Sequence, residues 1–122
     1  MPNKSHKNAV NHCKREIERN NLFRCRREWD VSRGKFLNAV DLACFGDNQN
    51  INAVGIEVES APKERWNSNK QILSNDLDLK EFSRIYPKSK TWHLHIDEVD
   101  KIDFDKELSI NPFSKRRFVS VR

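Results

Sequence analysis

The pattern of apolar and polar positions predicts one helix followed by three strands in the first half of the chain. Between residues 5 and 20 the apolar positions recur at helical spacing, and Ser5 is a suitable N-cap. Residues 22–31 alternate between apolar and polar side chains, as a half-buried strand does. Residues 36–45 and 51–59 are almost continuously apolar, which is typical of strands covered on both faces.

The second half predicts a helix and two further strands. Pro62 can open a helix over residues 63–85, which Pro87 ends. Its apolar side carries Trp66, Ile72, Leu73, Leu77, Leu79 and Phe82. Beyond it we expect a strand at 91–96, an acidic loop with some order at 97–110 and a short last strand at 116–122. Residues 1–122 then form a single α/β domain, in which the helix joins an antiparallel meander of three strands to the fourth.

Acidic residues interrupt the two most apolar strands. If the hairpin between these strands turns about Gln49, paired residue numbers sum to 98 and Asp41 lies opposite Glu57. Opposed side chains have Cβ atoms ~4.5–5.5 Å apart. Glu59 shares a strand face with Glu57, because side chains alternate along a strand. We therefore expect the three carboxylates to converge on one patch.

Buried carboxylates need a proton, a cationic partner or a metal ion. Magnesium prefers a few carboxylates together with waters and substrate phosphate, so the sequence predicts a magnesium site at Asp41, Glu57 and Glu59. The alternative is that these acids lie on a solvated face or pair with Lys and Arg.

The charge distribution favours a nucleic-acid partner. The net charge is +5, but residues 1–40 carry a balance of +6, residues 41–110 one of −5, and residues 111–122 four basic residues and no acid. Basic surface attracts phosphate backbones whatever their sequence, although a solvated basic face would give the same pattern. The residues expected to contact DNA are Arg24, Arg26, Arg33, Lys35, Lys63, Arg116 and Arg117.

Other chemistry finds less support in the sequence. Three cysteines without a C-x-x-C pair argue against a disulfide framework and a zinc ribbon, so we expect buried, reduced thiols. His93 and His95 form an H-x-H pair without further ligands at suitable spacing, and we expect them to be exposed. His6 is expected to be buried. With three glycines in the whole chain, the nucleotide-binding fingerprints are absent. No secretory signal or membrane span is recognisable, so a cytoplasmic protein without a membrane partner is expected.

The predicted order α-β-β-β-α-β, with Asp41 on the second strand and Glu57-Val58-Glu59 ending the third, resembles the PD-(D/E)xK nuclease superfamily. The resemblance covers about residues 5–96. It implies a restriction-endonuclease-like αβββαβ core, with a mixed sheet flanked by helices. It also implies hydrolysis of DNA phosphodiester bonds with Mg²⁺, for which Mn²⁺ can substitute. The family usually has a lysine two residues after the first glutamate. This chain has Glu59 there, as some restriction endonucleases do.

The resemblance also assigns roles to single residues. Asp41 and Glu57 would hold the metal, and Glu59 would bind it or act as a general base. Lys70, or alternatively Lys63, would supply the missing positive charge. The family often adds a glutamate before the hairpin, for which Glu28 and Glu16 are the candidates. A homodimer is expected because so short a chain offers little surface for duplex DNA.

Three other functions remain open at this stage. One is a non-catalytic DNA-binding protein on the same fold, and another is a nuclease for branched DNA like the Holliday junction resolvases. The third is a basic interaction module with no role in nucleic-acid binding.

Overall fold

The order of helices and strands follows the predicted order. The computed structural model describes residues 5–19, 22–31, 38–46 and 51–108. Its elements are α1 (His6–Glu18), β1 (Phe23–Asp30), β2 (Ala39–Gly46), β3 (Ala53–Glu59), η1 (Lys63–Ser68), α2 (Lys70–Ile85), β4 (Ser89–His95), η2 (Val99–Lys101) and α3 (Phe104–Leu108). The acidic segment predicted as a partly ordered loop at 97–110 contains the short helices η2 and α3. The strand expected at 116–122 lies outside the described residues.

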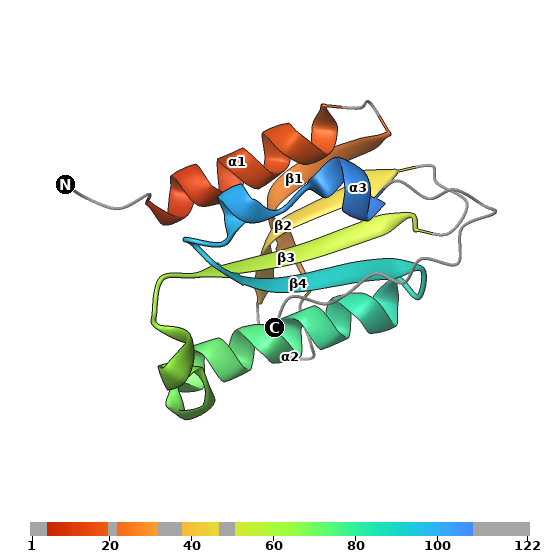
Figure 1. Ribbon diagram of the computed structural model, residues 1–122. Helices are drawn as coiled ribbons and strands as arrows, with labels where there is room; N and C mark the ends of the chain where they lie inside the picture. The colour runs from red at the N-terminus through yellow and green to blue at the C-terminus, as the bar shows by residue number, and fades with distance from the viewer. Residues whose placement is uncertain (1–4, 20–21, 32–37, 47–50, 109–122) are drawn as a thin grey trace.

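Four strands form one mixed sheet in the order β1-β2-β3-β4. β1 pairs with β2 and β2 with β3 in antiparallel directions, whereas β3 and β4 are parallel. Helix α2 carries the chain from β3 to β4 along one face of the sheet, and α1 and α3 cover the other (Figure 1). An α/β fold with a mixed sheet flanked by helices is therefore confirmed. No helix in the described segments is long and apolar enough to cross a membrane.

Helix α1 begins where a capping residue meets an apolar stripe. The Ser5 hydroxyl accepts a hydrogen bond from the backbone N–H of Asn8 at 3.1 Å, which satisfies one of the free donors of the first turn. The buried side chains of α1 are those of Ala9, Val10, Cys13 and Ile17. The expectation that His6 is buried is wrong, because this residue is the first of the helix and its side chain is 51% exposed.

The helix predicted over residues 63–85 is divided in two. Asn69 separates η1 from α2, and its side chain caps α2 by accepting a hydrogen bond from the N–H of Ile72 at 3.0 Å. The face of α2 that packs on the sheet carries the buried side chains of Ile72, Leu79 and Phe82. Leu73 and Leu77, which were expected on the buried side, are consequently 46% and 47% exposed.

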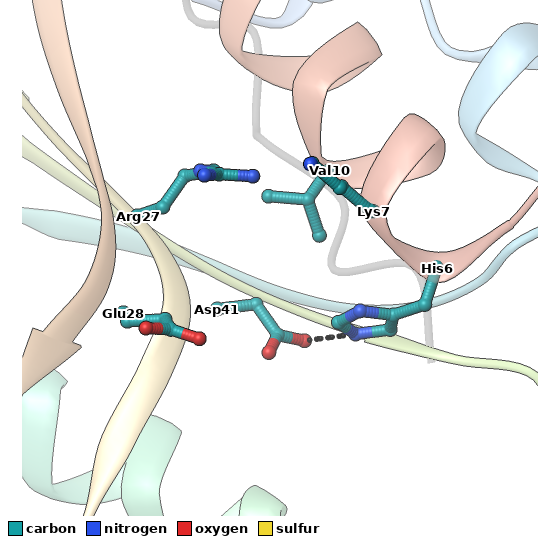
Figure 2. A pocket seen from close by; sticks show the side chains of 6 residues that line it. All are labelled: His6, Lys7, Val10, Arg27, Glu28 and Asp41. Atoms are coloured by element: carbon teal, nitrogen blue, oxygen red, sulfur yellow. Dashed lines mark hydrogen bonds and ion pairs between the residues drawn. The ribbon is translucent and has the colours of Figure 1, made fainter.

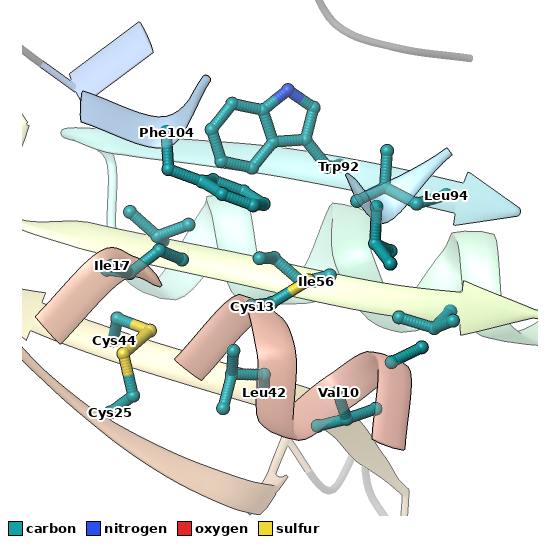
Figure 3. Close-up of a cluster of buried hydrophobic side chains, with 14 of the residues drawn as sticks. Val10, Cys13, Ile17, Cys25, Leu42, Cys44, Ile56, Trp92, Leu94 and Phe104 are labelled. Atoms are coloured by element: carbon teal, nitrogen blue, oxygen red, sulfur yellow. A yellow bond between two sulfur atoms is a disulfide. The ribbon is translucent and has the colours of Figure 1, made fainter. Parts of the chain in front are cut away.

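Two clusters of buried side chains hold the helices to the sheet. The cluster on the α1 and α3 side contains Trp92 and Phe104, whose rings meet edge-on with centroids 5.3 Å apart (Figure 3). The cluster on the α2 side is centred on Phe82. A Cβ atom at Gly55 would lie 2.7 Å from the Phe82 ring, so the glycine is what allows α2 to approach β3 this closely.

The expectation of three reduced thiols is wrong for two of the cysteines. Cys25 on β1 and Cys44 on β2 are direct cross-strand partners, and they form a disulfide beneath α1 (Figure 3). Cys13 of α1 is free and buried. The pairing depends on the β1–β2 register, which the spacing of cysteines along the sequence does not reveal.

We expect the Cys25–Cys44 disulfide to contribute about 3 kcal/mol to the free energy of unfolding, since it closes a loop with a sequence separation of 19. Unreduced protein, denatured and treated with iodoacetamide, should take up one alkyl group per chain, and reduced protein three. Urea unfolding of the wild type and of Cys25→Ala/Cys44→Ala measures the stability. Uptake of three groups without reductant would contradict the disulfide.

Candidate carboxylate site on strands β2 and β3

The pairing of β2 with β3 has the predicted register. Leu42 pairs with Ile56 and Cys44 with Val54, so the paired numbers sum to 98. One step beyond Leu42, two hydrogen bonds from backbone N–H groups to the carboxylates of Asp41 and Glu57 join the two strands. The N–H of Asp41 donates to Glu57 Oε1 at 2.8 Å, and the N–H of Val58 donates to Asp41 Oδ2 at 2.8 Å. The two acids therefore meet as the register predicts.

Glu57 is a carboxylic acid in an almost fully buried position. Its exposed fraction is 1%, and its second oxygen, Oε2, has no hydrogen-bond partner among the described residues. Burial raises the pKa of Glu57 to about 10, and the negative charge of nearby Asp41 adds to the rise, against the opposing effect of the Asp41 N–H. Without a cation beside it, Glu57 therefore keeps its proton at neutral pH.

Glu59 turns to a different set of partners. Its Oε2 accepts a hydrogen bond from Asn75 Nδ2 at 2.8 Å and lies 2.6 Å from His93 Nε2. The other ring nitrogen of His93 lies 3.7 Å from Asp76 Oδ1, and the Trp66 indole stacks on the imidazole at a centroid distance of 4.8 Å. The expectation that His93 and His95 are exposed is wrong, since the exposed fraction is 2% for the His93 side chain and 17% for the His95 side chain.

The convergence of all three carboxylates is consequently not found. Asp41 and Glu57 form one pair, whereas the Glu59 carboxylate is held by α2 and β4 through Asn75 and His93. In the described segments, no group of three His, Cys, Asp or Glu side chains is arranged to hold a metal ion. Alternation along β3 places Glu59 on the same strand face as Glu57. Its carboxylate nevertheless contacts His93 on the neighbouring parallel strand β4 instead of the other two acids.

A pocket of about 310 Å³ opens beside Asp41 (Figure 2). Glu28 of β1 lines it opposite Asp41, flanked by Arg27 of the same strand. From α1 come Lys7 and His6, whose Nε2 lies 3.0 Å from Asp41 Oδ2. Two carboxylates thus share a pocket with two cationic side chains and a histidine. Of these five residues, the sequence assigned only Asp41 and Glu28 to the metal site.

Glu28 has a backbone conformation that is unusual for a strand residue. Its φ angle is +54°, in the left-handed region. Before it, Cys25 faces the cluster on the α1 side, whereas beyond it Trp29 and Val31 face the cluster on the α2 side, although all three positions are odd. The left-handed residue therefore reverses the alternation of β1 beside Asp41, and a strained residue at such a place is a frequent mark of a functional site.

The remaining predicted site residues are distributed as follows. Lys70 is exposed at the start of α2, and among the described residues it has no hydrogen bond or salt bridge with the three acids. Lys63 pairs with Glu98 and lies over the Trp66 ring at 5.8 Å. Arg24 and Arg26 are exposed on the edge strand β1. Those that lie outside the described residues are Arg33, Lys35, Arg116 and Arg117.

The contributors that sequence reasoning missed include His6, Lys7, Arg27 and His93. His6 and Lys7 precede the apolar stripe of α1, and Arg27 interrupts the alternation of β1; this irregularity was the one available signal. His93 belongs to a strand that pairs with β3 only after a crossover, so no local pattern connects it with Glu59. Comparison with known proteins adds no further assignment, because no family model, curated protein or solved structure matches the chain.

We expect the free energy of unfolding to fall as the pH rises from about 5 to about 9. Folded Glu57, with a pKa near 10, keeps a proton that the unfolded chain loses near the ordinary value of 4.5. Its contribution is therefore complete below pH 4.5 and is lost as the pH approaches 10. The slope is at most about 1.4 kcal/mol per pH unit.

The matched variant for this test is Glu57→Gln, which has no proton to lose. Urea unfolding of both proteins at pH 5, 7 and 9 should show the variant gaining on the wild type as the pH rises. Lys90, whose pKa is lowered by burial, acts in the opposite direction in both proteins and cancels in the difference. Parallel pH profiles would contradict the buried proton.

We expect His93→Ala to lower the free energy of unfolding by about 2–4 kcal/mol, because it removes a buried ring and a partner of Glu59. The matched control is His95→Ala, two residues along the same strand, which should cost less than about 1 kcal/mol. Urea unfolding at pH 7 measures both. Equal losses would mean that the buried contacts of His93 have no special weight.

Proposed function

We propose that the protein is a magnesium-dependent endonuclease that hydrolyses DNA phosphodiester bonds, built on a restriction-endonuclease-like core. The observation that carries this proposal is the pairing of Asp41 with Glu57, whose buried Oε2 has no partner among the described residues. Two acids brought together in this way favour a cation, since otherwise one of them must remain protonated. The order α1-β1-β2-β3-α2-β4 supports the same family, because its acids lie on β2 and at the end of β3.

Asp41 and Glu57 are the residues that would hold the metal ion. A cation beside Glu57 would give its Oε2 a partner and favour its ionised form. Two carboxylates are sufficient, because Mg²⁺ is commonly held by one or two of them together with waters and phosphate. Glu28 lines the same pocket as Asp41 and is the third candidate ligand. Once bound, the ion would neutralise charge on the phosphate that is attacked.

The other side chains of the two sites suggest the remaining roles. Lys7 and Arg27 stand beside Glu28 and Asp41, and we assign them the positive charge that the family's lysine supplies. They replace Lys70 in this role. Glu59, whose carboxylate Asn75 and His93 hold outside the pocket, stays the general base that the sequence predicts, and it would reach the attacking water only after leaving these partners.

One observation favours a second candidate, a DNA-binding protein without activity. Glu59 occupies the place of the family's lysine, and one of its oxygens is already engaged by two partners. A chain that had lost catalysis would keep the basic surface but would not need a cation between Asp41 and Glu57. Metal binding therefore distinguishes the two candidates.

We expect the purified protein to cut DNA in Mg²⁺ or Mn²⁺ but not in EDTA. The substrates are supercoiled plasmid, single-stranded DNA and a four-way junction, and the junction tests the branched-DNA alternative. Asp41→Asn and Glu57→Gln should each lower the rate by about 100-fold or more. Glu64→Gln and Asp97→Asn, which alter exposed acids outside the pocket, should keep the wild-type rate.

Metal binding is measured separately from cutting. At pH 8, Mg²⁺ should raise the melting temperature of the wild type and have little effect on Glu57→Gln. DNA binding with neither a metal shift nor cutting would favour the second candidate. The absence of both cutting and DNA binding would refute both. Size-exclusion chromatography of the same samples tests the expected homodimer.

A further inference from the structure

Three half-buried aromatic side chains form a row across the α2 side of the sheet. They are Trp29 of β1, Phe45 of β2 and Tyr86 at the end of α2, and all three pack against the buried cluster on that side. The ring centroids lie 4.8 Å apart from Trp29 to Phe45 and 5.1 Å apart from Phe45 to Tyr86. We call these three residues the aromatic row.

The left-handed residue of β1 brings Trp29 into this row. Cys25 faces α1, and regular alternation would turn Trp29, four residues later, to the same side. Glu28 reverses the alternation, so that Trp29 joins the cluster on the α2 side instead. The aromatic row therefore exists because of an unusual backbone conformation in the edge strand.

Two arginines of β1 lie on the same face as the row. Arg24 and Arg26 alternate with Cys25, so they face away from α1, and their partners in β2 are Phe45 and Ala43. Both arginines are exposed, and in the described segments neither has a hydrogen bond or salt bridge with a carboxylate. Since α2 packs mainly on β2, β3 and β4, the arginines stand beside the helix rather than under it. Positive charge therefore borders the row at the edge of the sheet.

This combination matches the chemistry of a single-stranded nucleic acid. Its bases present flat π-faces that stack on aromatic rings, while its phosphates pair with guanidinium groups. The bases of a duplex are stacked on one another, so a duplex would meet the arginines but not the rings. The surface is therefore expected to prefer a single strand.

A second copy of the chain fits this surface less well. β1 is an edge strand of the described sheet, and edge strands can pair with another chain. Two β1 strands paired about a twofold axis would run antiparallel and bring Arg24, Arg26 and Arg27 of one chain close to those of the other. Like charges that face each other across strands are destabilising. The arginines therefore favour a polyanion over self-association.

We propose that the aromatic row and the two arginines beside it bind a single-stranded nucleic acid, whose bases stack on the rings and whose phosphates contact the guanidinium groups. Trp29 lies on the edge strand and is the expected first stacking position. The site is separate from the carboxylate pair, because the row lies on the α2 side, whereas α1 lines the Asp41 pocket. The inference goes beyond the proposed nuclease and requires no metal ion.

The test is fluorescence anisotropy with labelled oligonucleotides in EDTA, so that nothing is cut. A twelve-nucleotide oligothymidylate should bind at least about 10-fold more tightly than a hairpin with a stem of twelve base pairs. Trp29→Leu keeps an apolar side chain but removes the ring, and it should weaken binding by about 10-fold, the usual worth of one stacked base. The matched control is Trp66→Leu, which removes a half-buried ring outside the row and should change affinity less than about 2-fold. Melting temperatures show whether both variants are folded.

The arginines are tested by the salt dependence of binding. Arg24→Gln/Arg26→Gln should reduce the slope of log K against log salt concentration by about 1.4, since each lost phosphate contact on a single strand contributes about 0.7. Lys101→Gln/Lys106→Gln removes the same charge from exposed positions on η2 and α3, and it should leave the slope unchanged.

Intrinsic fluorescence distinguishes contact from a merely structural role of Trp29, because a stacked base quenches an indole. The oligonucleotide should quench the wild type and Trp66→Phe. Trp29→Phe, which keeps a ring for stacking, should bind without that quenching.

Three results would overturn the inference: duplex binding as tight as that of the single strand, equal weakening by the two leucine variants, or quenching that persists in Trp29→Phe. A dimer that Trp29→Leu dissociates, with unchanged oligonucleotide affinity, would assign the surface to a second copy instead. The two proposals fail separately. Binding that depends on the row, without metal-dependent cutting, would refute the nuclease alone. Metal-dependent cutting, with binding unchanged in the Trp29 and arginine variants, would refute this site alone.

Discussion

The burial of Glu57 beside Asp41 is the constraint on which the candidate site depends. At this point the backbone ladder between β2 and β3 gives way to two bonds in which each carboxylate accepts a main-chain N–H from the other strand. The exchange leaves Glu57 Oε2 without a partner among the described residues. A buried oxygen in that state is costly, and proteins commonly retain such a cost where a bound group relieves it. The nuclease proposal identifies that group as a divalent cation.

The neighbouring strand contributes to the same place through its backbone. Glu28 takes a left-handed conformation opposite Asp41, and this single residue reverses the alternation of β1. Cys25 before it packs under α1, while Trp29 beyond it packs against the α2 side. One strand can therefore supply Arg27 and Glu28 to the pocket and apolar side chains to the clusters on both faces of the sheet. The strain at Glu28 is offset by the packing on both of its sides.

The sequence was sufficient for the acid pair because that prediction required only a short hairpin and strict alternation. Asp41 and Glu57 meet because residue numbers that sum to 98 face each other, as the turn about Gln49 implied. Contacts that depend on distant elements were not accessible. Glu59 meets His93 after a crossover of more than 30 residues, and Cys25 meets Cys44 only in one register of β1 against β2. The sequence predicted that the helix begins after Pro62, whereas α2 begins after Asn69. Both residues are suitable helix starts, and local propensity does not say which of them is used.

The Cys25–Cys44 disulfide makes the connection between β1 and β2 stronger than the connection between β2 and β3. It is a covalent bond between β1 and β2, so the strands that carry Glu28 and Asp41 move together. No such connection joins β2 to β3, and next to the acids their backbone pairing ends at Leu42 and Ile56. A backbone displacement that changes the spacing between Asp41 and Glu57 therefore has to occur between β2 and β3. The covalent bond, whose two cysteines lie three residues from Glu28 and Asp41, therefore fixes the β1–β2 seam, whereas hydrogen bonds alone hold the β2–β3 seam beside the acids.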